Sequence, residues 1–149
     1  MQRPTRDEAV GRLRDLCLSL PGVSEKLSHA EPTWFVKKSF AMFADHHHDE
    51  RLAFWCAAPE GMQEALVASE PERFFRPPYV GVRGWLGVYL DVPVDWEEIA
   101  DIVTEAYRCV APPKLVARLE ALSRNAQASS GPLAGVGAEP QVRTDEASA

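Results

Sequence analysis

The sequence predicts an α+β protein in which helices cover one face of an antiparallel sheet. Segments with apolar residues at three- and four-residue spacing alternate with short runs in which apolar and polar residues alternate. Three of the strand-like runs follow one another through short links, and only antiparallel strands can be joined in that way. The order of one helix, three strands, a helix, a strand pair and a helix therefore predicts a two-layer sandwich with about five strands.

The first predicted helix begins at Thr5-Arg-Asp-Glu8, which has the form of a capping box. Pro21-Gly22 ends this helix. One apolar stripe lies between the two signals and consists of Val10, Leu13, Leu16, Cys17 and Leu20. Residues 23–32 are mostly polar, and we expect them to form a connection to the sheet.

Three short strands are predicted next, at Thr33–Val36, Ser39–Ala44 and Arg51–Ala57. Lys37-Lys38 is the length of a tight hairpin link. Asp45–Glu50 is a longer, polar link. Two hairpins in succession predict an antiparallel meander.

A second helix is predicted to begin near Pro59, a residue that suits a first helical turn. Its inner face is predicted to carry Met62 and Leu66, with Ala65 and Ser69 beside them. The pattern predicts a short helix.

Asp95-Trp-Glu-Glu98 is a further capping box and opens a third helix, which Ala111-Pro-Pro113 ends. Lys114–Leu122 is a predicted short last helix. Small, polar and helix-breaking residues dominate from 123 to 149, which predicts a disordered tail after a folded domain at 1–122. The apolar stripe of the third helix consists of Ile99, Ile102, Val103, Ala106 and Val110.

The stretch FFRPPYVGVRGWLGVYLD at Phe74–Asp91 is predicted to form an extended arm, a bend and a central strand. Alternation along the strand gives Leu86, Val88 and Leu90 to the helix layer. The opposite, open face of the sheet is then left with an aromatic platform made of Phe43, Trp55, Trp85 and Tyr89. Flat apolar surfaces of this kind usually bind a partner.

The chain has 149 residues, of which 46% are hydrophobic and 26% are charged, a composition typical of one globular core. No apolar run reaches the length of about 20 residues that a membrane span needs. The charged amino-terminal segment predicts a cytoplasmic location without a membrane partner. The three cysteines lie far apart without a CxxC pair, and we expect them to be reduced residues of the core.

Several segments together resemble the MmcQ/YjbR family over roughly Ala9 to Leu119. These are LPGV (Leu20–Val23), the TWFV–KKSFAMFA hairpin, the central block with PPY-x-G-x-R-GW-x-G, and DWEEIADIVTEAYRCVAPPKL. The resemblance implies a CyaY-like fold, which is a curved antiparallel sheet with helices on one side, and a role in DNA binding. The acidic first helix of the related iron-binding proteins is not present here, because Arg12 and Arg14 interrupt it.

The functional prediction is a non-enzymatic module that binds DNA or RNA through a local aromatic and basic surface. Bases can stack on aromatic rings while cations contact phosphates, so a net charge of −6 still allows binding at a local patch. The first alternative is an interface with another protein or a second copy of the chain on the open sheet face. The candidate surface consists of Arg83, Trp85, Tyr79, Arg76, Tyr89, Trp55, Lys37 and Lys38.

Catalytic and metal sites receive little support from the sequence. No HExxH, Walker, GxGxxG or GxSxG motif is present, so no catalytic residue or cofactor is assigned, and small-molecule binding or an enzyme is the third hypothesis. The run Asp45–Glu50 contains contiguous histidines, whose side chains point in different directions in a turn. His46 and His48 are therefore only weak metal candidates, and no metal is predicted.

Overall fold

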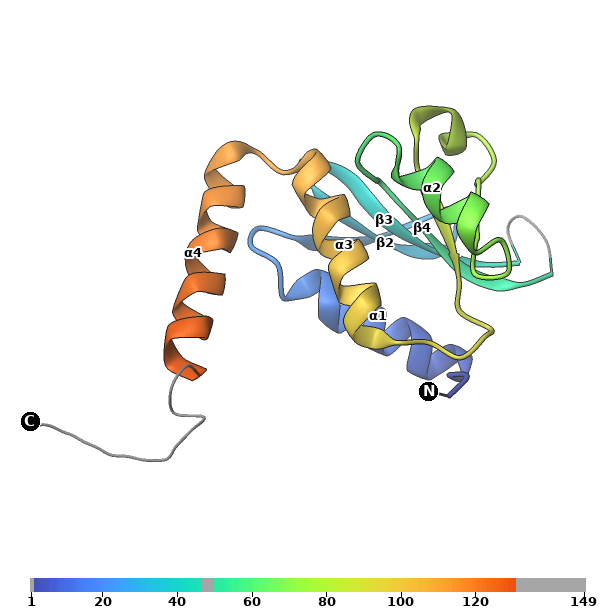
Figure 1. Ribbon diagram of the computed structural model, residues 1–149, viewed down its shortest axis with the longest axis horizontal. Coiled ribbons are helices and arrows are strands. Elements are labelled where there is room, and N and C mark those ends of the chain that lie inside the picture. Colours follow the sequence, from blue (N-terminus) through green and yellow to red (C-terminus); the bar gives the residue numbers. More distant parts are fainter. Residues whose placement is uncertain (1, 47–49, 131–149) are drawn as a thin grey trace, which may run out of the picture. The chain divides into compact units, whose positions relative to one another are not determined.

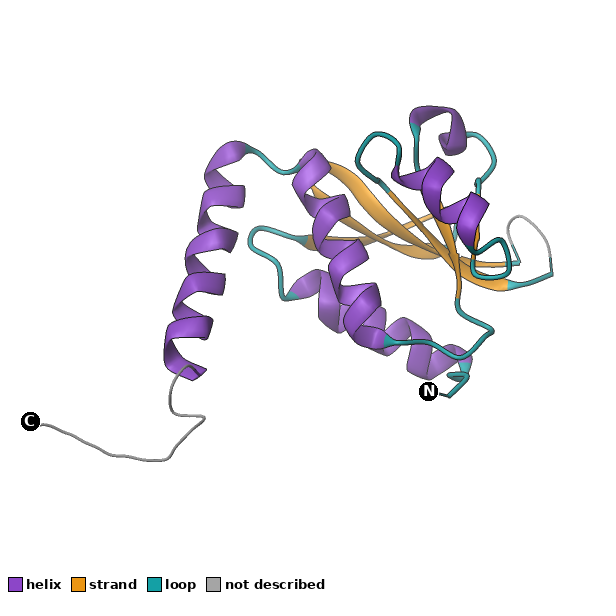
Figure 2. Cartoon of the chain, in the orientation of Figure 1, coloured by secondary structure: helices purple, strands orange, loops and turns teal. Residues whose placement is uncertain are grey.

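The computed structural model describes residues 2–46 and 50–130. Contacts divide the chain into two compact units, one ending at Pro112 and the other starting at Pro113. Figure 2 shows the helices and strands of the described residues. These are α1 (Arg6–Leu18), β1 (Ser24–Ser28), β2 (Glu31–Val36), β3 (Lys38–Asp45), β4 (Leu52–Cys56), α2 (Met62–Ser69), β5 (Phe74–Phe75), the 3₁₀ helix η1 (Val80–Arg83), β6 (Leu86–Tyr89), α3 (Trp96–Val110) and α4 (Pro113–Ser130).

The strands form one antiparallel sheet in the order β1-β2-β3-β4-β6-β5. The α+β class and the antiparallel sheet were correctly predicted, although the sheet has six strands rather than about five. Figure 1 shows α3 crossing in front of α1. The predicted central strand β6 lies between β4 and the short edge strand β5.

The predicted capping box at the start of α1 is confirmed. The Thr5 hydroxyl accepts a hydrogen bond from the Glu8 amide at 3.2 Å, and the Glu8 carboxylate accepts one from the Thr5 amide at 2.9 Å. Two amide groups that the first helical turn leaves unpaired are thereby satisfied. The helix buries Ala9, Leu13 and Cys17 against the sheet side of the unit.

The edge strand β1 lies within a segment that the sequence predicted to be a polar connection. Its five residues include one large apolar residue, Leu27, which is 74% exposed. The β1–β2 hairpin turns at His29 and Ala30, which both have positive φ values of 54° and 66°. Such two-residue turns usually contain Asn or Gly, so this hairpin lacked the usual sequence signal.

A bulge in β3 corrects the predicted faces of this strand. Trp34 pairs with Ala41 while Phe35 pairs with Ser39, so Phe40 is an extra residue in the ladder. Both Phe40 and Ala41 are fully buried as a result. The assignment of Phe43 to the open face was wrong. It pairs with the core residue Phe54 of β4 and lies under the guanidinium of Arg6 from α1.

α3 carries the predicted apolar stripe, and its Ile99, Ile102, Val103 and Ala106 are buried. The ring of Tyr107, also on α3, meets Phe40 edge to face with centroids 5.8 Å apart. The Tyr107 hydroxyl donates to the Pro21 carbonyl at 2.7 Å. The core therefore lies between α1, α3 and the covered face of the sheet.

α2 differs from the prediction in its inner face. Ala65 and Ser69 are exposed, Leu66 is half-buried, and the buried residue of the helix is Gln63. The preceding Gly61 has φ +87° and occupies the N-cap position, so the helix begins after the predicted Pro59. A polar side chain was not expected on this face because helices normally bury apolar residues there.

α4 belongs to the second unit. It begins one residue before the predicted Lys114 and continues to Ser130, beyond the predicted end at Leu122. The first part of the predicted disordered tail is thus helical. The rest of that prediction, residues 131–149, lies outside the described residues. Among the described helices, none combines the length and apolar character needed to cross a bilayer.

Candidate functional site

The open face of the sheet is divided into a filled part and a hollow part. The ring of Phe75 lies directly on Gly87, where an added Cβ would come within 2.4 Å of the ring. Phe75 also stacks on Tyr89 with ring centroids 4.6 Å apart, and the Arg51 guanidinium lies over the Tyr89 ring, 3.5 Å from its centroid. Arg51 is in turn paired with Asp91 at 2.7 Å. Tyr89 thus belongs to this filled part and does not line the hollow.

The hollow part is a cavity of about 650 Å³, which we call the aromatic cavity. Trp55 and Trp85, both predicted site residues, line it and are 5% and 6% exposed. The predicted flat platform is therefore a recess with buried walls. Other lining residues were missed by the sequence prediction, and one of them, Met42, was missed because the bulge in β3 reverses the faces after it. They are Phe35, Ser39 and Met42, with Thr33 beside them.

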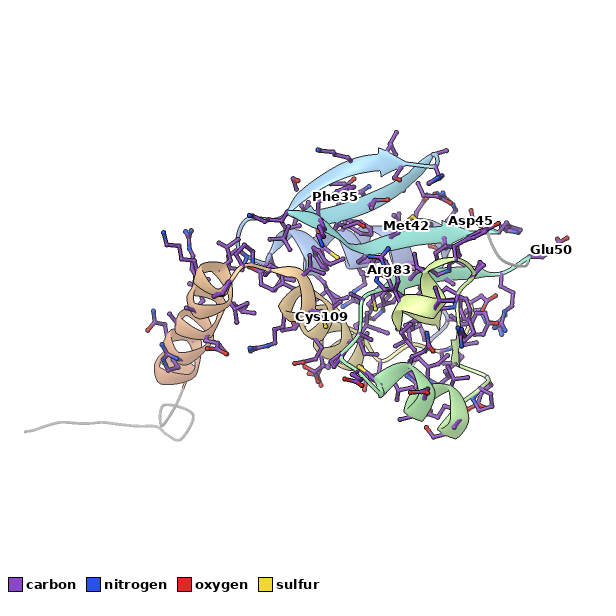
Figure 3. The ribbon with its side chains drawn as sticks, turned by 90° about the horizontal axis from the view of Figure 1, so that it is seen from above. Phe35, Met42, Asp45, Glu50, Arg83 and Cys109 are labelled. Carbon is purple, nitrogen blue, oxygen red and sulfur yellow. The ribbon has the colours of Figure 1, made fainter. Side chains whose placement is uncertain are left out.

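Figure 3 labels Phe35 and Met42 on the sheet and Arg83 on the segment of η1. This segment supplies one wall of the aromatic cavity through Tyr79 and Val80. It is fixed from beneath by the buried Gln63, whose amide donates to the carbonyls of Gly81 at 2.9 Å and of Trp85 at 2.5 Å. A helix residue thus holds the wall in place.

Tyr79 stands at the centre of a strained γ-turn. Its φ is +64° and its ψ is −63°, and the Val80 amide donates to the Pro78 carbonyl at 2.6 Å across the turn. Turns of this kind are rare because the side chain is crowded at positive φ. The Tyr79 side chain is 88% exposed, so the turn presents an aromatic ring to solvent beside the aromatic cavity.

A second recess, which we call the basic hollow, adjoins the aromatic cavity. Lys37, Lys38 and Arg83 line it, and Ser39 and Trp85 line both recesses. The Arg83 guanidinium lies over the Trp85 ring at 5.5 Å, which is a cation–π arrangement. The structure therefore brings together five predicted site residues around one double recess, namely Lys37, Lys38, Arg83, Trp55 and Trp85, with Tyr79 at its rim.

The charges around the double recess have one sign. Among the described residues that line either part, none is Asp or Glu, although the chain has 22 acidic and 16 basic residues. Lys26 adds a further cation, with its ammonium 5.4 Å from the ring of Phe35 in the cavity wall. An anion bound in the basic hollow would meet cations without a carboxylate competing for them.

Several other arginines of the unit are paired with carboxylates away from the double recess. Arg14 donates to Glu25 at 2.8 Å, and Trp34 donates to the same carboxylate at 2.9 Å. The bond from Arg14, together with the one from Trp34, lowers the pKa of Glu25. Such pairs stabilise the fold, whereas Lys37, Lys38 and Arg83 of the basic hollow have no carboxylate partner among the described residues.

Arg76 is exposed, and its side-chain stem lies against Gly81, where an added Cβ would come within 2.6 Å of it. It lines neither recess. Gly81 accommodates Arg76, and Gly84 ends η1 with φ +86°, a conformation that favours glycine.

The weak metal candidates gain nothing from the structure. His46 contacts the Asp45 carboxylate, and His48 lies outside the described residues. Across residues 2–46 and 50–130, no group of three or more His, Cys, Asp or Glu side chains is arranged to hold a metal ion.

The cysteines show no sign of nucleophilic activation. Burial raises the pKa of the Cys17 and Cys56 thiols, so both stay protonated at neutral pH. Cys109 borders the basic hollow and is exposed, yet partial burial and the nearby Glu105 raise the pKa of its thiol as well. The expected placement of all three cysteines in the core holds for the first two and was wrong for Cys109.

Fold and site together define a two-layer α+β domain whose open sheet face carries an aromatic cavity with a basic border. The chain belongs to the YjbR family, whose model matches residues 18–109, so the predicted family is confirmed. The crystal structure of the Deinococcus radiodurans protein DR2400, a DUF419 domain, is similar with a TM-score of 0.55. The two chains share 20% identity, and the match covers 66% of this chain and 75% of that one. At this identity the similarity establishes the fold alone. Among curated proteins none matches the chain.

Proposed function

We propose that this protein is a binding module for single-stranded nucleic acid and that the double recess is its contact surface. The observation that carries the proposal is the contact between an aromatic cavity and a basic hollow that share Ser39 and Trp85, with no carboxylate among their described lining residues. Single strands are bound by aromatic rings that stack on bases and by cations that follow the backbone. The double recess offers both groups side by side.

Single-stranded nucleic acid suits this surface better than a duplex. Trp55 and Trp85 are recessed walls, and bases locked in a duplex cannot enter a recess without unpairing. The net charge of −6 also opposes unspecific binding to a long, highly charged duplex. We therefore expect weak duplex binding and tighter binding of DNA or RNA strands that have unpaired bases.

The test is fluorescence anisotropy with labelled strands of about 12 nucleotides, a length within the range of known single-strand sites. Three cations in the basic hollow predict that log K falls against log salt with a slope of about −2, since each contact contributes about −0.7. Lys37→Ser/Lys38→Ser should weaken binding and bring the slope to about −0.7. Lys114→Ser/Arg118→Ser removes the same charge from exposed positions of α4 and serves as the matched control.

Two outcomes would contradict the proposal. One is an affinity that does not change with salt. The other is an equal loss in the hairpin variant and the α4 control, because net charge rather than the basic hollow would then explain the binding.

A protein interface is the second candidate, and two exposed apolar side chains favour it. Tyr79 and Val82 are 88% and 76% exposed. Tyr79 directly precedes η1, and Val82 lies within it. Sedimentation over a range of protein concentrations tests whether a second copy binds there. Val82→Ser distinguishes the candidates, because Val82 lines neither recess: it should dissociate a dimer while leaving strand binding intact.

A further inference from the structure

The aromatic cavity is deeper than surface stacking requires. Its volume of about 650 Å³ lies in the range of about 300–1,000 Å³ that is typical of pockets for small ligands. Trp55 and Trp85 line the cavity but are only 5% and 6% exposed, so a small part of each ring faces it. A recess of this volume can enclose a ligand group.

A buried polar atom in the cavity wall has no partner. The indole Nε1 of Trp55 is covered and, within the described part of the chain, donates a hydrogen bond to no group. Buried donors are rarely left unpaired, because the loss of their bond to water is then not compensated. Trp55 lies on β4 between Met42 and Gly87 and lines the aromatic cavity.

The rim of the cavity stores backbone strain. The γ-turn at Tyr79 persists because Gln63 holds the following segment through two hydrogen bonds. Strained non-glycine residues are concentrated at ligand clamps and switches. An exposed aromatic ring on such a turn is well suited to cover a planar group that has entered the cavity.

We infer that the aromatic cavity holds one nucleobase, taken out of the stack of the bound strand. The base lies in the cavity beside Trp55 and Trp85, Tyr79 covers it, and a carbonyl or ring nitrogen of the base accepts the hydrogen bond of Trp55 Nε1. Because that nitrogen is covered, the indole turns slightly when the base binds. The phosphate next to this base contacts Lys37, Lys38 or Arg83 in the basic hollow. This inference rests on the proposed function, and the same chemistry also fits a free nucleotide.

The first experiment compares an ordinary strand with a strand of equal length that lacks its bases. Loss of base stacking should weaken binding about 5- to 150-fold, as for other single-strand sites. A salt-dependent affinity that is equal for the two strands would overturn the inference and leave the proposed function intact. Binding of nucleosides and mononucleotides without binding of strands would overturn the proposed function and would show that the cavity serves a free ligand.

The second experiment tests the hydrogen bond. Trp55→Phe keeps an aromatic ring and removes the donor, and should weaken base-bearing strands about 2- to 12-fold with no change for the strand without bases. Trp96→Phe is the matched control, because Trp96 lies at the start of α3 under Arg12 and lines neither recess. Tryptophan fluorescence should change on ligand addition in the wild type and in the control. A Trp55→Phe protein that folds and binds as tightly as the wild type would refute the assigned hydrogen bond.

Discussion

Gln63 is expected to connect the stability of the fold to the binding surface. Its side-chain amide is 7% exposed and donates to the carbonyls of Gly81 and Trp85, which lie on either side of the end of η1. Each neutral hydrogen bond contributes about 0.5–1.5 kcal/mol net, so two bonds contribute about 1–3 kcal/mol. Gln63→Ala also leaves a small cavity and two under-satisfied carbonyls. We therefore expect it to lower the free energy of unfolding by about 2–4 kcal/mol.

Urea unfolding with an unchanged m-value measures this loss. Gln63→Met separates the two contributions, because it restores most of the volume but not the donor, and it should recover less than half of the stability. Glu64→Ala is the control, since Glu64 is the exposed neighbour on the same helix. At temperatures where Gln63→Ala is still folded, it should also weaken strand binding, because Tyr79 and Val80 lose their support. A loss below about 0.5 kcal/mol, the scatter of ordinary surface substitutions, would show that Gln63 does not hold the η1 segment.

Two further predictions concern particular contacts. Because bonds from Arg14 and Trp34 lower the pKa of Glu25 in the folded protein, its contribution to stability is present above the unfolded pKa of about 4.3 and is lost as the pH falls below it. Urea unfolding at a series of pH values should show that Glu25→Gln has a weaker acid dependence than the wild type, and equal curves would contradict this. Gly87→Ala should destabilise the protein by about 1–3 kcal/mol, because the added methyl group meets the ring of Phe75. The cost should be much smaller in a Phe75→Leu background, as a double-mutant cycle can measure, and additive effects would show that this contact is not the cause.

The parts of the fold that were predicted correctly depend on local signals. The capping box at Thr5 and the stripe of α3 act within a few residues, so they can be recognised without tertiary context. β1 was missed because an edge strand with an exposed Leu27 has no buried face, and its hairpin turns without Asn or Gly. The length of α4 was underestimated because its later residues are small and polar and resemble a tail, although Arg124, Ala126 and Gln127 among them favour helices.

Six of the residues that line the double recess were among the predicted site residues, but the form of the surface was not predicted. Strand alternation correctly gave Trp55 and Trp85 to one face, and both line the aromatic cavity. The β4–β6 register agrees, because Trp55 pairs with Gly87, and Trp85 lies two residues before Gly87. The bulge at Phe40 is one residue without a sequence signal, and it moved Met42 into the cavity and Phe43 into the core. That the platform is hollow depends on how η1 folds over the sheet. This is a tertiary contact made by a glutamine that helix periodicity would not place inside.

The distribution of charge along α3 explains how an acidic chain can attract a polyanion to one place. Asp95 and Glu98 at the start of α3 border a hollow rich in carboxylates, whereas Cys109 and Val110 at its end border the basic hollow. A helix of 15 residues separates the two by about 20 Å, which is more than the screening length of about 8 Å at physiological salt. The acidic end therefore repels a strand without cancelling the local potential at the basic hollow. We therefore expect a bound strand to place its phosphates at the basic hollow, beside the last residues of α3, and its nearest base in the adjoining aromatic cavity.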